Sequence, residues 1–126
     1  MKELKYPSKE TIKRLTEELN LKGADKYTQD WECEVANVDQ LSDHIKFYRN
    51  SELNLNEKST LMRIILEAYN DYISFGNEED LYGEFIKEIL ESEYYIHKES
   101  ITYWSCGNED LSDCFAISSF MRTLQE

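Results

Sequence analysis

The sequence predicts a mainly α-helical fold, with four to five helices packed into one compact domain that spans residues 1–126. Only four glycines and one proline are present, which disfavours a fold built from many tight turns. Apolar residues recur every three or four positions in several segments, the period of an amphipathic helix. Hydrophobic residues make up 40% of the chain, enough for a core of one domain. A short β element of two or three strands stays open as an α+β variant.

The first expected helix begins at Pro7 or Ser8, with Ser8 as its N-cap, because a serine hydroxyl can accept the free N–H groups of a first turn. Gly23 is the expected C-terminal stop, since glycine readily adopts the left-handed backbone that ends helices. Three apolar residues lie between them at helical spacing: Ile12, Leu15 and Leu19.

The segment Asp30–Val35 alternates polar and apolar residues, the pattern of a half-buried strand with Trp31, Cys33 and Val35 facing inward. A helix is the competing interpretation, because Tyr27, Trp31 and Val35 lie four residues apart. We take the strand as the prediction.

Two helices are expected in the middle of the chain. Asp39 is the expected N-cap of the first, which should end near Asn50. Asn54 or Asn56 should cap the second, which runs to about Phe75. The inward face of the first helix consists of Leu41, His44, Ile45 and Tyr48. The second has the broadest apolar stripe in the chain: Leu61, Met62, Ile64, Ile65, Leu66, Ala68, Tyr69, Tyr72 and Ile73.

A further helix is expected after Asn77, which would cap a first turn formed by Glu78, Glu79 and Asp80. Carboxylates are favourable there because the N-terminal end of a helix carries a partial positive charge. Its expected buried set is Leu81, Tyr82, Phe85, Ile86, Ile89 and Leu90. Its opposite face carries Glu84, Glu88 and Glu91.

The last third of the chain is less regular. Residues 101–117 contain strand formers around a turn-like segment, which predicts either a short hairpin or a helical continuation. Ser118 or Ser119 is expected to cap a final helix. The pattern leaves open whether Trp31 and Trp104 belong to the core or to a contact surface.

Acidic residues crowd into one part of the chain. Between Glu67 and Asp113, thirteen Asp and Glu residues are opposed only by Lys87 and Lys98, so this stretch carries −11 of the formal net charge of −12. It is also rich in aromatic residues. Negative charge mixed with large rings is typical of a surface that attracts and then binds a basic protein. Such a chain is repelled by phosphate backbones and anionic lipids, so neither nucleic acid nor a membrane is expected as a partner.

No pattern of catalytic or metal-ligating residues stands out, so we predict that the chain is not an enzyme and needs no metal or cofactor. The glycines are isolated, which excludes a Gly-rich phosphate loop and a nucleophile elbow. Cys33, Cys106 and Cys114 form no CxxC pair and the start of the chain lacks a signal-peptide pattern, which predicts reduced thiols in the cytoplasm. No apolar run reaches the roughly 18 residues of a membrane span.

The C-terminal half resembles small acidic immunity proteins of bacterial polymorphic-toxin and contact-dependent inhibition systems. The resemblance lies in Leu61–Tyr72, Ile101–Ser105 and Asp113–Arg122. It implies a compact, cytoplasmic, non-enzymatic protein that plugs the active site of a basic nuclease toxin. Contact residues vary between members of such families, so none is transferred to this chain.

Charge and resemblance together predict a cytoplasmic inhibitor of a basic partner, most simply a toxin domain. The alternative is an intracellular helical adaptor that binds another protein through an apolar groove. Neither the partner's identity nor the oligomeric state follows from the sequence. The expected partner contacts are acidic and tyrosine side chains: Glu78, Glu79, Asp80, Glu84, Glu88, Glu91, Glu93, Tyr94, Tyr95, Glu109 and Asp110.

Overall fold

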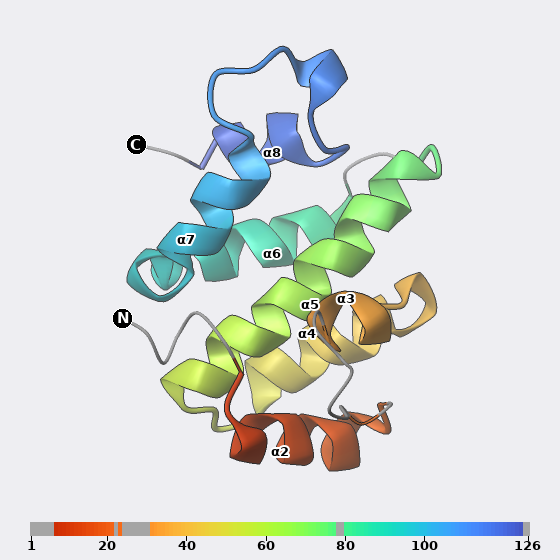
Figure 1. The fold of residues 1–126 in the computed structure, drawn as a ribbon, viewed down its shortest axis with the longest axis vertical. Coiled ribbons are helices and arrows are strands. Elements are labelled where there is room, and N and C mark those ends of the chain that lie inside the picture. Colours follow the sequence, from red (N-terminus) through yellow and green to blue (C-terminus); the bar gives the residue numbers. More distant parts are fainter. Residues whose placement is uncertain (1–6, 22, 24–30, 78–79, 125–126) are drawn as a thin grey trace. The chain divides into compact units, whose positions relative to one another are not determined.

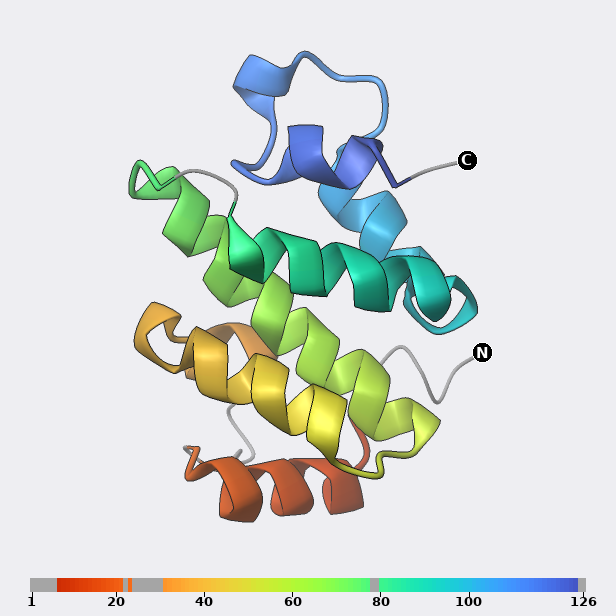
Figure 2. The same ribbon diagram turned by 180° about the vertical axis from the view of Figure 1, so that it is seen from behind.

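The computed structural model describes residues 7–21, 23, 31–77 and 80–124. These residues form seven α-helices and two short 3₁₀ helices, and none of them lies in a strand. The mainly helical prediction is therefore confirmed for this part of the chain, whereas the predicted number of helices was too low and the β element is not found there. The chain divides into two compact units, residues 1–68 and 69–126, which are described separately below (Figures 1 and 2).

Unit 1 contains α2 (Lys9–Leu19), α3 (Trp31–Val35), the 3₁₀ helix η1 (Val38–Gln40), α4 (Leu41–Asn50) and the first part of α5 (Leu55–Ser74). Figures 1 and 2 both show α4 beside the first part of α5. The largest buried side chains of this unit are Leu15, Trp31, Leu41, Ile45, Tyr48, Leu61, Met62, Ile64, Ile65 and Leu66. The predicted inward faces of α4 and of this part of α5 are thus confirmed.

The N-terminus of α2 is capped as predicted, because Ser8 Oγ accepts the backbone N–H of Thr11 at 3.1 Å. Its C-terminus lies earlier than expected. Asn20, not Gly23, takes the left-handed conformation that ends the helix, with φ 56°. Asparagine tolerates this conformation better than most residues, since its short polar side chain can bond locally.

The predicted strand at residues 30–35 is wrong in its described part, which is α3. Trp31 and Val35 lie four residues apart, so a helix buries both, and they are 3% and 7% exposed. Cys33, which the strand would have turned inward, is exposed on the other side. Trp31 therefore belongs to the buried interior.

The cap of α4 also differs from the prediction. The Asn37 side chain accepts the N–H of Asp39 at 2.9 Å and starts η1, after which Gln40 occupies the N-cap position of α4. Asp39 is therefore part of the turn before the helix. This short 3₁₀ turn continues directly into α4, so no separate side-chain cap forms there.

The start of α5 is held by reciprocal bonds between Asn54 and Glu57. Asn54 Oδ1 accepts the N–H of Glu57 at 2.8 Å, and Glu57 Oε1 accepts the N–H of Asn54 at 2.9 Å. This arrangement is a capping box, which satisfies two backbone donors at once. Arg14 of α2 adds an ion pair to the same Glu57 oxygen at 2.8 Å. The alternative cap, Asn56, instead accepts the N–H of Ser8.

Unit 2 contains the last part of α5, α6 (Leu81–Ser92), α7 (Tyr94–Ser105), the 3₁₀ helix η2 (Leu111–Asp113) and α8 (Ser118–Arg122). Gly76, with φ 99°, follows the end of α5. In Figures 1 and 2, α8 lies against the last turns of α7. The main buried side chains are Tyr69, Ile86, Ile89, Leu90, Ile96, Ile101, Trp104, Ile117, Phe120, Met121 and Leu124.

The start of α6 differs from the prediction. Asp80 is the N-cap, and its Oδ1 accepts the N–H of Tyr82 at 3.0 Å. Asn77 instead donates its side-chain N–H to the carbonyl of Tyr72, so it belongs to the preceding turn. Leu81 is 59% exposed rather than buried, since it opens the first turn. Glu78 and Glu79 lie outside the described residues.

Residues 101–105 continue α7, so the hairpin is wrong and the helical alternative holds. Ile101 and Trp104 lie three residues apart on the inward face, and Trp104 is 5% exposed. After Cys106 the chain folds back, which brings the Cα atoms of Cys106 and Cys114 to 5.8 Å in a disulfide. The prediction that all thiols are reduced is therefore wrong for this pair. Ile117, not a serine, occupies the N-cap position of α8.

Candidate protein-binding surface

The two units share the acidic residues equally but not the basic ones. Residues 1–68 contain thirteen Asp and Glu with eleven Lys and Arg, a formal charge of −2. Residues 69–126 contain thirteen Asp and Glu with only three Lys and Arg, a formal charge of −10. Most of the net charge therefore belongs to unit 2, where every predicted contact residue lies.

Two arginines of unit 1 pair with carboxylates of the same unit. Arg14 pairs with Glu57 at 2.8 Å, and Arg63 pairs with Glu32 at the same distance. The Arg63 and Glu32 side chains are 21% and 15% exposed, so this pair is screened by water less than a surface pair. Two carboxylates of unit 1, those of Glu57 and Glu32, thus have basic partners within the fold.

The basic side chains of unit 2 do not neutralise its carboxylates in the same way. Arg122 donates from Nε to the carbonyl of Ser105 at 2.8 Å and from Nη2 to the carbonyl of Glu109 at 2.7 Å. Lys87 and Lys98 are exposed. Within the described part of the chain, none of these three side chains forms an ion pair with a carboxylate.

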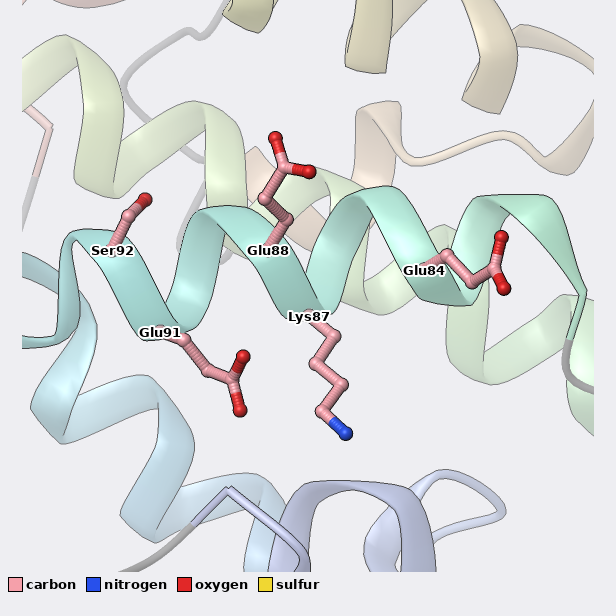
Figure 3. A pocket seen from close by; sticks show the side chains of 5 residues that line it. All are labelled: Glu84, Lys87, Glu88, Glu91 and Ser92. Atoms are coloured by element: carbon pink, nitrogen blue, oxygen red, sulfur yellow. The ribbon is translucent and has the colours of Figure 1, made fainter.

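Three predicted contact residues, Glu84, Glu88 and Glu91, are exposed along α6. The spacings of four and three residues place them on one side of the helix, where like charges repel. Together with Lys87 and Ser92 of the same helix, they line a shallow hollow that is widely open to solvent (Figure 3). Lys87 lies three residues after Glu84 and four before Glu91, so it offsets one of the three charges. The hollow keeps a formal charge of −2.

Asp80 has a structural role as well as exposure. Besides capping α6, its carboxylate accepts a hydrogen bond from the Tyr72 hydroxyl. This bond, with smaller contributions from desolvation and the negative charge of Asp80, raises the pKa of Tyr72. Because Asp80 already accepts two bonds within the fold, it has less capacity to accept from a partner than the glutamates of α6.

The residues predicted at the start of α7 differ in accessibility. Tyr95 is 72% exposed, whereas Glu93 and Tyr94 are half-buried. The Glu93 backbone N–H bonds to the carbonyl of Ile89 and joins the end of α6 to the start of α7. Of these three residues, Tyr95 therefore offers the largest surface to a partner.

Glu109 and Asp110 lie on the loop that the Cys106–Cys114 disulfide closes, and both are exposed. Figures 1 and 2 share a vertical axis, and both draw this loop well above α6. The structure thus separates the predicted contact residues of the disulfide loop from those of α6.

Several exposed apolar residues of unit 2 were missed by the sequence analysis. Phe75 is 73% exposed, Leu81 59%, Tyr103 61% and Leu111 49%. Phe75 and Leu81 flank the turn between α5 and α6, and Leu111 lies in the disulfide loop. The apolar periodicity that marks buried positions gives no signal for such residues at helix ends and in loops.

Within the described ranges, no group of three or more His, Cys, Asp or Glu side chains is arranged to hold a metal ion. None of the helices in these ranges has both the length and the apolar character needed to cross a bilayer. Comparison of the chain with protein-family models, with curated proteins and with solved structures found no match.

Proposed function

We propose that this chain is a protein-binding inhibitor that neutralises a basic partner, and that it acts in the cytoplasm as an immunity protein against a nuclease-type toxin domain. The observation that carries the proposal is the charge of unit 2, −10 over residues 69–126, together with exposed carboxylates that form no ion pair with Lys87, Lys98 or Arg122 among the described residues. Such charge repels itself and destabilises the compact state. A basic partner removes that cost when it binds.

The mechanism follows from the chemistry of the α6 hollow. A nuclease binds the phosphates of its substrate with Lys and Arg side chains, and the carboxylates of Glu84, Glu88 and Glu91 would take the place of those phosphates. Long-range attraction accelerates association, and exposed apolar side chains then slow dissociation by burying their surface. Tyr95 and Phe75 are suited to this second step, because more than 70% of each is exposed.

The first experiment identifies the partner. If the adjacent upstream gene encodes a large secreted protein, its C-terminal domain is expressed with and without this chain. Growth should stop without the chain and recover with it, and the two proteins should co-purify. Continued killing in the presence of the full, folded chain would refute the inhibitor function.

The second experiment tests the surface. The triple variant Glu84→Gln, Glu88→Gln and Glu91→Gln should associate with that domain about tenfold more slowly at low salt, and the salt dependence should become weaker. A matched control removes three exposed glutamates from α2: Glu10→Gln, Glu17→Gln and Glu18→Gln. Stopped-flow measurements of the association rate over a range of NaCl concentrations distinguish the α6 triple variant from the α2 control. If both triple variants slow association equally, only net charge matters and the α6 face is not the binding site.

The adaptor function is supported by one specific observation. Of the six large apolar side chains exposed in the described residues, five belong to unit 2: Phe75, Leu81, Tyr95, Tyr103 and Leu111. An adaptor that binds through them would associate at a rate nearly independent of salt. It would tolerate the α6 triple variant and lose affinity when Phe75 or Leu81 is replaced by Ser.

A further inference from the structure

Helix α7 presents two tyrosines and one glutamate at intervals of four residues: Tyr95, Glu99 and Tyr103. We call these three residues the α7 stripe. All three are exposed, Tyr95 by 72% and Tyr103 by 61%. Over eight residues a helix rises about 12 Å, and residues four apart stay on neighbouring parts of one face. The stripe is therefore a continuous strip of ring, carboxylate and ring.

The Tyr103 ring is held in place although most of the residue faces solvent. Its centroid lies 5.3 Å from that of Trp104, edge-on, and 5.2 Å from that of Phe115. Trp104 is buried, and Phe115 directly follows Cys114 of the disulfide. A ring supported in this way loses little conformational freedom on binding, which favours its use as an anchor.

Glu99 carries a charge that its helix does not neutralise. The positions three and four residues away are occupied by Tyr95, Ile96, Thr102 and Tyr103, none of which is basic. Lys98 is adjacent in sequence, but neighbouring residues of a helix do not face each other. In the described residues, the Glu99 carboxylate forms no ion pair.

We propose that the α7 stripe binds an arginine side chain of a basic protein partner. The guanidinium would pair with Glu99 and lie flat against the ring of Tyr95 or Tyr103. Arginine fits better than lysine, because its planar group stacks on aromatic rings while its N–H groups bond to a carboxylate. Charge complementarity selects this occupant, since unit 2 carries a formal charge of −10.

This inference rests on the proposed function, because it names the side chain that the inhibitor would recognise in its partner. It adds a contact that the charge of α6 does not supply. The α6 hollow attracts any cation, whereas the α7 stripe distinguishes a planar guanidinium from a compact ammonium group. The two surfaces therefore predict different responses to arginine and lysine.

The test uses hexa-arginine and hexa-lysine peptides as probes of equal charge. Binding to the full chain is followed at low salt by amide chemical shifts. Hexa-arginine should shift the amides of Tyr95, Glu99 and Tyr103 and should bind more tightly than hexa-lysine. Tyr95→Ala, Tyr103→Ala or Glu99→Gln should each weaken hexa-arginine binding about two- to fivefold, the range expected for one exposed cation–ring contact.

Thr102→Ala is the matched control, since Thr102 is exposed on the same helix and offers neither ring nor charge. It should leave both affinities unchanged. Equal binding of the two peptides, with no effect of the stripe variants, would overturn the inference. If binding then depends on Glu84, Glu88 and Glu91, the proposed function stands and the stripe alone fails. If the α6 triple variant also binds normally, both fail.

A second copy of the chain is the other possible occupant of exposed tyrosines. Analytical ultracentrifugation of the wild type and of Tyr95→Ala with Tyr103→Ala decides this case. A monomer in both is the expected result. A wild-type dimer that the double variant dissociates would assign the stripe to self-association and overturn the arginine assignment.

Discussion

Alanine at position 83 is expected to destabilise the protein, although alanine is the better helix former. A Cβ on Gly83 would lie 2.6 Å from Oη of Tyr69, far inside normal contact. Tyr69 is fully buried, and its ring centroid lies 5.8 Å from that of Tyr72 and 5.6 Å from that of Phe120. Moving the hydroxyl away from the new Cβ therefore means shifting a fully buried ring that packs against two others.

The magnitude is a difference between two opposing effects. Adding a group to a packed interior lowers the unfolding free energy by about 1–3 kcal/mol, whereas replacing glycine by alanine within a helix raises it by about 1 kcal/mol. The Gly83→Ala variant should thus lose up to about 2 kcal/mol of unfolding free energy. For a chain of this length that corresponds to a decrease of up to about 8 °C in Tm. Denaturant unfolding measures the loss, and an unchanged m-value shows that the denatured state is unaffected.

A second substitution isolates the contact. Tyr69→Phe removes Oη, after which the nearest atoms to the new Cβ are Tyr69 Cζ at 3.5 Å and Phe120 Cε1 at 3.6 Å, ordinary contact distances. The double variant should therefore be more stable, by at least about 1 kcal/mol in unfolding free energy, than the sum of the two single-variant effects predicts. Additivity within about 0.5 kcal/mol would refute the reasoning, because it would show that the two groups do not compete for space. Gly23→Ala, where nothing lies closer than 4.0 Å, is the control.

Three further perturbations test other parts of the fold. Burial lowers the pKa of His44 below 6.5, so His44 of the unfolded chain binds a proton at a higher pH than His44 of the folded protein. The contribution of His44 to the unfolding free energy is therefore greatest above about pH 6.5 and decreases as the pH falls below it. Replacing His44 by Leu should make the unfolding free energy, measured by urea unfolding, depend less on pH between about pH 5 and 7. An unchanged pH dependence would exclude His44 as its source. The Cys106–Cys114 disulfide joins two residues that are 8 positions apart, so its reduction should lower the unfolding free energy by up to about 2.5 kcal/mol. Thermal unfolding with and without dithiothreitol measures this loss. An unchanged Tm with both thiols labelled would contradict this. Asn54→Ala should cost about 1 kcal/mol, because it removes one half of the capping box with Glu57, whereas Asn54→Ser should retain most of it. Unchanged stability of Asn54→Ala would show that the cap does not contribute.

The helices were predictable because their signals are local. Ser8 was predicted as a cap, and Asn54 was one of two predicted caps with Asn56, since serine and asparagine side chains bond to the first turn that follows them. The face of α4 was predicted from spacing alone, and its four inward residues are buried. Each of these inferences depends on residues within a few positions of one another.

The errors arise where local patterns permit two answers. In the segment Trp31–Val35, the alternation of apolar residues fits a strand, whereas the spacing of four between Trp31 and Val35 fits a helix. Trp31 and Val35 are buried and Cys33 is exposed, which is the burial pattern of a helix. The disulfide depends on a chain reversal after Cys106 that no spacing rule reveals. The contact between the rings of Tyr103 and Phe115 depends likewise on how the chain returns to α7. Such features follow from tertiary placement, not from local propensity.

The two units differ in how their acidic residues are balanced by basic ones. A solvated acidic face is common, and by itself indicates no partner. In unit 1, however, the same number of acidic residues is nearly matched by eleven Lys and Arg residues, and two of the arginines pair with Glu57 and Glu32. In unit 2 the one arginine, Arg122, donates to the carbonyl of Ser105 at the end of α7 and to that of Glu109 in the disulfide loop. It therefore joins the loop to the helix and neutralises no carboxylate by an ion pair in the described residues. Unit 1 shows that this chain can nearly balance its acidic residues with basic ones. The repulsion between the carboxylates of unit 2 is therefore not a requirement of folding. That repulsion is relieved when cations are supplied from outside, which is the role that the inhibitor proposal gives to the partner.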